Sequence, residues 1–244
     1  MRAAEWEFRH RFWVYFAIFG GAFGCYAFDH TNVIAWLVRI ARGTLHDASD
    51  LPITPIRAAL FVAGAIAIVG AALRTWAAAY LRTEVVHDTA LHSDRLVADG
   101  PYRHLRNPLY VGVLLAGLGL SALASRVGAA VLLVGMPWFT LRLIGREEAE
   151  LEAAGGESYR AYKAAVPRLL PSLRPRLPRG DARPRWGQAL LGETFFWAVA
   201  ASILVFAWTL RIETYYLVLG AAFLVRGLLA MLWWRRRRRV AAPG

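Results

Sequence analysis

Long apolar stretches with few charges recur along this chain and decide its fold class. A helix needs about 20 apolar residues to cross the roughly 30 Å of hydrocarbon in a bilayer. The stretches that approach this requirement are 12–40, 56–81, 109–124, 127–145, 189–210 and 215–234. Hydrophobic residues make up 57% of the chain, which excludes a disordered chain and an ordinary soluble domain. We therefore expect an all-α fold, a polytopic membrane helix bundle of about six transmembrane helices.

The distribution of basic residues predicts how this bundle is oriented. Arginine and lysine favour the cytoplasmic side of a membrane, and most of them lie in inner segments if the N-terminus is inside. The outer turns then hold only Arg42, Arg126 and Arg211. This count requires the first stretch to cross once, ending near Phe28 and continuing into an interfacial turn at residues 29–32. Both termini are therefore expected in the cytoplasm.

The net charge of +12 raises the question of an acidic partner. The arginines alternate with apolar runs and do not form one soluble basic face, so nucleic acid is not expected. Anionic membrane lipids are the expected partner.

Closely spaced prolines between residues 166 and 188 prevent a helix and predict an extended segment on the membrane surface. We expect residues 1–171 to form a core of four spans plus a cytoplasmic helix, with residues 172–188 as a linker. Residues 189–244 would form a two-span hairpin with a basic tail. We expect this hairpin to serve packing or homodimerisation and not to line a pocket.

Two arginines lie inside apolar stretches, where a charge is costly. Arg74 lies about 10 Å deep and is expected to snorkel toward the membrane surface, with an internal partner as the alternative. Arg226 lies near the middle of the last stretch and must face protein or water. We expect Glu193 to be too far along the helix axis to be its partner.

The most informative polar segment is GPYRHLRNPLYVG at residues 100–112, where the chain re-enters the bilayer. Pro108 suits the first turn of a helix, and helix N-termini offer unpaired N–H groups to anions. Arg103 and Arg106 can add a bidentate clamp on a carboxylate or phosphate. Anchoring of these arginines to lipid headgroups is the alternative.

Two adjacent acids, Glu147 and Glu148, follow the fourth apolar stretch. Glu147 shares a helix face with apolar residues, and a carboxylate in such surroundings needs a cationic partner. The third and fourth stretches are joined by residues 125–126 alone, so they form a hairpin whose inner ends meet. The Arg106 region and the Glu147 region would then be neighbours, and together they would bind the opposite charges of an amino acid zwitterion. A solvated acidic turn is the alternative.

A further group of ionisable residues, His87, Asp88, His92 and Asp94, raises the question of a metal site. The chain has only 6 histidines, too few for the histidine clusters of membrane di-iron oxygenases, so no metal is expected.

The polar segments resemble the isoprenylcysteine carboxyl methyltransferase and phospholipid methyltransferase superfamily. The matching motifs are GPYRxxRxPxYxG at 100–112, EExxL at 147–151 and YxxYxxxVPR at 159–168. These families are integral membrane enzymes that use S-adenosylmethionine. The resemblance implies catalytic roles for Arg106, Glu147 and Glu148. It also implies a cofactor site lined by Tyr102, Arg103, His104, Asn107, Pro108 and Tyr110.

The resemblance further implies an active site that faces the cytoplasm and a methyl acceptor that is lipid-like or small and apolar. An isoprenylcysteine carboxylate, a phospholipid amine and a thiol all remain open as acceptors. Many members have histidine where this chain has Asn107, so any role that needs a protonatable ring would pass to His104.

Two other functions remain open at this point. Sterol-type membrane reductases have a similar helical architecture and bind NAD(P)H, although the paired acids at 147–148 argue against a site for two phosphates. A non-enzymatic transporter or assembly factor would leave the ordered motifs unexplained.

Overall fold

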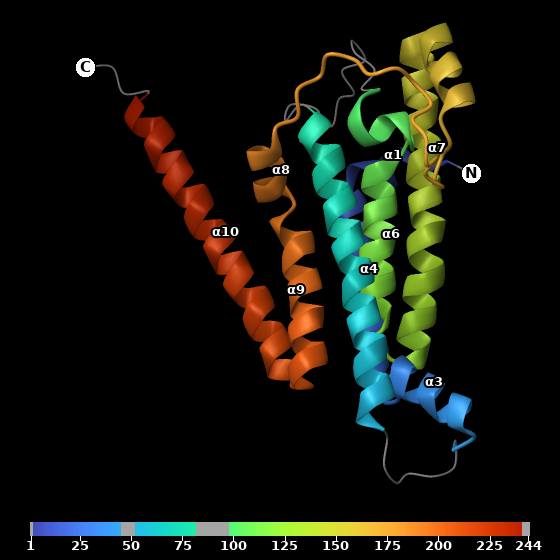
Figure 1. The fold of residues 1–244 in the computed structure, drawn as a ribbon, viewed down its shortest axis with the longest axis vertical. Coiled ribbons are helices and arrows are strands. Elements are labelled where there is room, and N and C mark those ends of the chain that lie inside the picture. Colours follow the sequence, from blue (N-terminus) through green and yellow to red (C-terminus); the bar gives the residue numbers. More distant parts are fainter. Residues whose placement is uncertain (1, 45–51, 82–97, 241–244) are drawn as a thin grey trace.

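The computed structural model describes residues 2–44, 52–81 and 98–240, and within these ranges it contains helices and irregular connections but no strand (Figure 1). The predicted all-α fold is therefore confirmed for the described part of the chain. The elements are α1 (Glu5–Arg9), α2 (Arg11–Gly24), the 3-10 helix η1 (Cys25–Ala27), α3 (Val33–Arg42), α4 (Ile53–Tyr80), the 3-10 helix η2 (Gly100–Arg103), α6 (Pro108–Ser121), α7 (Arg126–Ala165), α8 (Trp186–Gly192), α9 (Thr194–Thr209) and α10 (Ile212–Val240).

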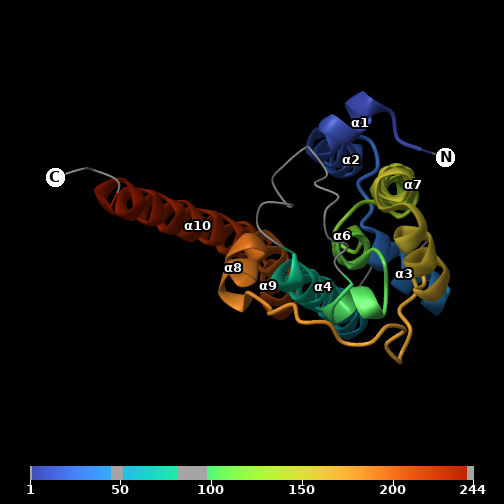
Figure 2. The ribbon, with the colours of Figure 1, turned by 90° about the horizontal axis from the view of Figure 1, so that it is seen from above.

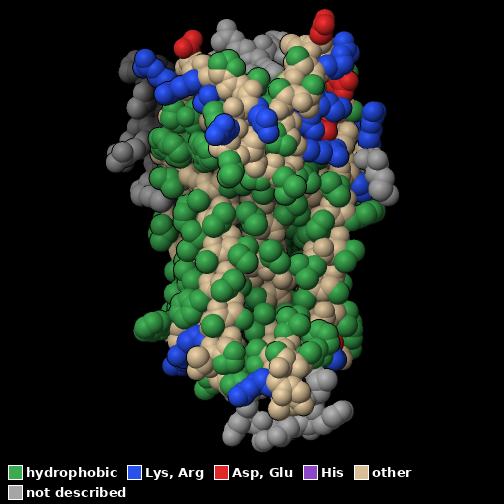
Figure 3. Space-filling model, turned by 45° about the vertical axis from the view of Figure 1, so that its right-hand side comes forward, with side chains coloured by type: hydrophobic (Ala, Val, Ile, Leu, Met, Phe, Trp, Pro, Cys, Tyr) green, Lys and Arg blue, Asp and Glu red, His purple; other side chains and the backbone are tan. Residues whose placement is uncertain are grey.

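Two of the described helices, α4 and α7, are long and apolar enough to cross a membrane. The bent pair of α8 and α9 adds a third if it is counted as one span, and α6 is a shorter apolar helix. Figure 3 shows a broad apolar band between one densely charged end of the bundle and an opposite end with fewer charges. We call these the charged end and the opposite end. The six crossings and the cytoplasmic termini remain predictions, although α1 and the end of α10 both lie toward the charged end (Figure 1).

The first apolar stretch breaks at the residues where the sequence predicts an interfacial turn. α2 and η1 reach the opposite end, and α3 lies across it (Figure 1). Asn32 caps α3, because its Oδ1 accepts hydrogen bonds from the Ile34 and Ala35 amides at 2.9 and 3.2 Å. The Asn32 side-chain amide also donates to the carbonyls of Ala122 and Ala124 at 3.0 and 3.2 Å, which joins this turn to the α6–α7 connection.

Glycines allow α4 and α6 to approach closely. A Cβ atom on Gly70 would lie 2.8 Å from the Gly112 carbonyl oxygen, and one on Gly119 would lie 2.7 Å from that of Ala63. Membrane helices pack closely in this way where small residues face each other. The pair fixes the start of α6 beside the C-terminal part of α4, at the charged end.

α7 reverses direction at Gly156, whose φ of 54° and ψ of −125° lie outside the helical region. Glycine adopts these angles without the steric cost that other residues meet. The last turns of α7 run back beside its main part (Figure 1). They lead into an irregular segment, residues 166–185, that crosses the charged end to reach α8 and that we call the strap (Figure 2). The prolines therefore prevent a helix here, as the sequence predicts.

The last two helices form a hairpin at the edge of the bundle. α9 packs along α4, whereas α10 packs against α9 and diverges from the bundle toward its C-terminal end (Figures 1 and 2).

Candidate functional site

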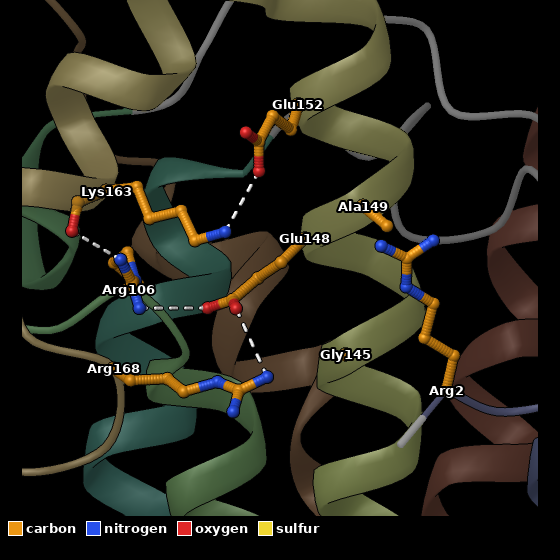
Figure 4. Close-up of a pocket in the computed structure, with 8 residues that line it drawn as sticks. All are labelled: Arg2, Arg106, Gly145, Glu148, Ala149, Glu152, Lys163 and Arg168. Carbon is orange, nitrogen blue, oxygen red and sulfur yellow. Dashed lines mark hydrogen bonds and ion pairs between the residues drawn. The ribbon is translucent and has the colours of Figure 1, made fainter.

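A pocket of about 350 Å³ opens at the charged end, a volume in the range of small-molecule sites (Figure 4). Its lining combines cationic and acidic side chains from the N-terminus, the connection before α6, α7 and the strap. The lining residues are Arg2, Arg106, Gly145, Glu148, Ala149, Glu152, Lys163 and Arg168. A pocket with both signs of charge is suited to a ligand that carries both signs itself.

Glu148 lies at the centre of the polar contacts in this pocket (Figure 4). Its Oε1 accepts from Arg106 at 3.2 Å and from the Asn107 amide at 3.3 Å, while its Oε2 lies 3.2 Å from Arg168 Nη2. The side chains of Glu148 and Arg106 are only 7% and 9% exposed. Removing one partner of a buried ion pair is strongly destabilising, so each of these charges depends on the others.

The reversal at Gly156 supplies a second layer of contacts. It brings Lys163 back to α7, where its Nζ lies 2.9 Å from Glu152 Oε2. The Lys163 carbonyl accepts from Arg106 Nη1 at 2.5 Å, and the backbone N–H of Arg106 donates to the Pro167 carbonyl at 2.9 Å. The pocket is therefore assembled from the connection before α6, both arms of α7 and the start of the strap.

Two arginines of the pocket retain free donors. The Nε atoms of Arg106 and Arg168 are buried and have no hydrogen-bond partner among the described residues. Buried polar groups are almost always hydrogen-bonded in native proteins, so these atoms indicate capacity for an additional acceptor. Guanidinium groups suit a carboxylate or phosphate in that role.

Of the residues that the sequence predicts for the site, the structure brings Arg106, Asn107 and Glu148 into direct contact. Pro108 is the first residue of α6 and is buried beside them. Tyr102 is buried, and its carbonyl accepts a hydrogen bond of 3.0 Å from the Tyr162 hydroxyl.

Arg103 and His104 contact the strap and are not among the residues that line the pocket. Arg103 Nε donates to the Leu177 carbonyl at 2.8 Å, and His104 Nδ1 lies 2.8 Å from the Ser172 carbonyl oxygen. Both side chains therefore hold the strap over the charged end.

Of the two adjacent acids, Glu148 is the one that pairs with Arg106. Adjacent residues on a helix point about 100° apart, so only one of the two acids can face Arg106. Glu147 is half-buried and faces the hydroxyl of Tyr110 instead. The predicted meeting of the Arg106 region with the acidic pair is therefore seen in the structure, with Glu148 as the acid in contact. Which of the two acids would hold a cofactor remains a prediction.

Four further residues contribute to the charged end without being predicted from the sequence as site residues: Lys163, Arg168, Glu152 and Asp99. Arg168 belongs to the YxxYxxxVPR motif, which could have indicated it. Asp99 accepts from the Gly180 and Ala182 amides at 2.7 and 3.1 Å and so holds the far part of the strap. No local sequence pattern indicates Glu152, because its partner Lys163 lies beside it only as a result of the reversal of α7 at Gly156.

The sequence favours an Arg74 that snorkels to the membrane surface. In the structure Arg74 faces an internal partner instead. Its Nε and Nη2 donate to the two carboxylate oxygens of Glu193 at 2.6 and 3.1 Å. The guanidinium also lies 3.9 Å from the Phe196 ring centroid, and Nη1 donates to the Leu109 carbonyl at 3.1 Å. Glu193 is thus paired with Arg74. Arg226 instead donates hydrogen bonds to backbone carbonyls.

The histidines and aspartates at 87–94 lie outside the described residues. Within the described ranges, no group of three or more potential metal ligands occurs.

Comparison with known proteins gives two matches. The phospholipid methyltransferase family matches residues 58–154. The Protein-S-isoprenylcysteine O-methyltransferase of Schizosaccharomyces pombe is 36% identical over 77 residues, which cover 31% of this chain and 33% of that protein. The match thus spans about a third of the relative's length. No solved structure matches.

Both matches confirm the resemblance to the superfamily of membrane methyltransferases. The family match includes Arg106, Asn107, Tyr110, Glu147 and Glu148 and ends before Lys163 and Arg168.

Proposed function

We propose that this protein is a membrane methyltransferase that uses S-adenosylmethionine and acts on a lipid-like or small apolar acceptor. The observation that carries the proposal is the pocket around Glu148, where opposite charges meet inside the segment that matches the phospholipid methyltransferase family. The alternative of a nicotinamide-dependent reductase is not favoured, because carboxylates among the cations would repel two phosphates.

The residues of the pocket fit the amino acid portion of S-adenosylmethionine. Its carboxylate can accept from the buried Nε atoms of Arg106 and Arg168, which lack partners among the described residues. Its ammonium can bind the carboxylate of Glu148 or Glu152, both of which line the pocket. Each charge on the ligand therefore has an opposite charge available within one cavity.

Methyl transfer needs alignment more than it needs covalent catalysis. When bound, the cofactor supplies an activated methyl group on a sulfonium. The task of the chain is to hold the reacting atoms in line and to exclude water. Arg106 and Glu148 would orient the cofactor, and the apolar bundle would admit the acceptor laterally. A carboxylate or thiolate acceptor needs no base, whereas a protonated amine must lose its proton, which Glu147 or Glu148 could accept.

We also propose that the charged end faces the cytoplasm and contacts anionic lipids. The strap is rich in arginine, and its Leu170 and Leu173 are 83% and 99% exposed. Exposed leucines beside arginines are typical of segments that lie at a membrane interface. Homodimerisation through the α9–α10 hairpin remains a prediction.

Titration of the purified protein in nanodiscs with S-adenosylhomocysteine tests the proposal. We expect saturable binding by calorimetry, with adenosine as the control ligand that lacks the amino acid portion and should bind more weakly. NADPH should not stabilise the protein against heat. Absence of saturable S-adenosylhomocysteine binding would overturn the proposal. Transfer of tritiated methyl groups to a total membrane extract would then identify the acceptor.

A further inference from the structure

The junction between α8 and α9 contains an acidic residue, Glu193, whose side chain is buried in the bundle. The two helices meet at an angle of 61°, and Glu193 lies between them. Its side chain is 7% exposed although the helices around it are apolar. An ionisable residue in such surroundings is expensive and is retained for a specific contact.

That contact is Arg74 of α4, which holds both carboxylate oxygens of Glu193. The Arg74 side chain is 16% exposed and has one further donor, Nη1, directed at the Leu109 carbonyl in the first turn of α6. Arg74 thus joins the tail hairpin to the helix that begins beside the pocket. Leu109 follows Asn107 by two residues, and Asn107 donates to Glu148.

The helix junction itself is stabilised by a second arginine. Arg226 of α10 donates from Nη1 to the carbonyls of Leu191 and Gly192 at 2.6 and 3.2 Å. The bend interrupts regular helical bonding here, and carbonyls in an apolar region require other donors. The Thr194 hydroxyl also donates to the Leu191 carbonyl, at 2.8 Å, so Arg226 adds a second donor there. Arg226 therefore supports the bend that turns Glu193 toward Arg74.

We propose that Glu193 is a positioning residue for the pocket, acting through Arg74 on the first turn of α6. The tail hairpin would then be part of the functional unit and not a separate packing element. Without the Glu193 carboxylate, Arg74 would be a buried charge without its counterion and would turn toward water. The Leu109 carbonyl would lose the side-chain donor that it has besides its helical bond, and the turn that carries Asn107 and Pro108 would loosen. The effect on binding rests on the proposed function.

The first test compares Glu193→Gln with Trp197→Phe in nanodiscs. Trp197 Nε1 donates to Thr75 Oγ1 at 2.9 Å, another α9–α4 hydrogen bond that does not involve α6. We expect Glu193→Gln to weaken S-adenosylhomocysteine binding roughly threefold to thirtyfold, the usual effect of a residue coupled to a site without touching its ligand. Trp197→Phe should keep wild-type affinity. Unchanged affinity in Glu193→Gln, or an equal loss in Trp197→Phe, would overturn the proposal.

A charge swap separates positioning from simple attachment of the tail. The double variant Arg74→Glu with Glu193→Arg restores opposite charges between α4 and the tail, but residue 74 can no longer donate to the Leu109 carbonyl. We expect the swap to recover thermal stability relative to Glu193→Gln without recovering affinity. Full recovery of affinity would show that Glu193 only attaches the tail. Should Glu193→Gln fail to fold, Glu193→Asp keeps the charge and should give a smaller loss in the same direction.

Hydrogen exchange provides a readout that does not depend on the cofactor. We expect amide exchange in the peptide 105–112 to be faster in Glu193→Gln than in wild type or Trp197→Phe, with no ligand present. Equal exchange in all of these proteins would overturn the positioning role. If exchange responds but wild type does not bind S-adenosylhomocysteine, the positioning role stands and the proposed function fails.

Discussion

The two ends of the bundle each hold a buried carboxylate that is paired with arginine, but the carboxylates have different surroundings. At the opposite end, Asp29 accepts from Arg126 Nη2 and from the Val127 amide, both at 2.9 Å, and from the Thr31 amide at 3.3 Å. Both oxygens are therefore satisfied, largely by the backbone of adjoining turns. Arg126 is 46% exposed, so its remaining donors reach solvent.

At the charged end, Glu148 is held by side chains alone among the contacts described for it. Both arginines around it have a buried Nε without a partner in the described structure, and a pocket adjoins them. The ion pair of Asp29 therefore stabilises a turn at the opposite end, whereas the arginines around Glu148 keep donors that a ligand could use. A buried donor without a partner also occurs in Arg142, which pairs with Glu7, so it is the combination of such donors with an adjoining pocket that distinguishes the candidate binding site from the structural pair.

The largest effect should come from removing the central charge of the pocket. Glu148→Gln is expected to weaken S-adenosylhomocysteine binding about tenfold to a hundredfold, the usual effect of losing a charge-assisted hydrogen bond. Asp29→Asn is the matched variant at the opposite end, and it should lower the melting temperature while leaving binding unchanged. Calorimetry and thermal unfolding in nanodiscs measure both quantities. Equal binding losses in the two variants would remove the distinction between the two ends.

A second prediction concerns the reversal of α7. Gly156→Ala must place a Cβ atom on a backbone with φ of 54°, which should cost about 1 to 3 kcal/mol of stability. Because the reversal supplies Lys163 and Arg168, ligand binding should weaken together with stability. Gly187→Ala in α8 is the control, since its backbone has an ordinary φ and its Cβ would meet nothing within 4 Å. A Gly156→Ala protein with wild-type stability and binding would contradict the prediction.

The two arginines around Glu148 should differ in effect. Arg168 is 39% exposed whereas Arg106 is 9% exposed, so water screens Arg168 more strongly. We expect Arg168→Gln to weaken S-adenosylhomocysteine binding by no more than about fivefold. Arg106→Gln should weaken it more. A larger loss for Arg168→Gln would show that the pocket is organised around the strap and not around α6.

The smallest effect concerns acid stability of the opposite end. The hydrogen bond from the Val127 amide, with that from Arg126, lowers the pKa of Asp29 below its ordinary value. A lowered pKa stabilises the folded state above the ordinary pKa of aspartate, near 3.9, and that contribution is lost as the pH falls through the folded value. The difference in melting temperature between wild type and Asp29→Asn should therefore shrink on acidification. A difference that grows at acid pH would contradict this assignment.

The sequence predicts the local elements of this fold well. The apolar stretches predict the helices, and the polar residues 29–32 predict the break in the first of them. The closely spaced prolines predict the irregular strap. The reversal at Gly156 is not predicted, because a single glycine in a polar helical segment does not reveal which φ it adopts. The contact between the Arg106 region and the acidic pair follows from a short hairpin, but the choice of Glu148 depends on how α7 is rotated about its axis.

Contacts between distant segments do not follow from the sequence. Arg74 and Glu193 are 119 residues apart, and only the packing of α9 on α4 brings them together. Taken alone, the sequence around Arg74 predicts a snorkelling arginine, and Glu193 is considered only as a distant neighbour of Arg226. A costly charge in each of two apolar segments was the signal that could have paired them.

The contact between Arg226 and the bend of α8 and α9 has a consequence for biosynthesis. The chain emerges from the ribosome N-terminus first, so the carbonyls of Leu191 and Gly192 are made 34 to 35 residues before the arginine that binds them. Until α10 is made, the bend lacks this donor and Glu193 lacks the support for its inward position. The last helix therefore completes a junction that the preceding helices begin, and truncation within α10 should affect a region translated well before it.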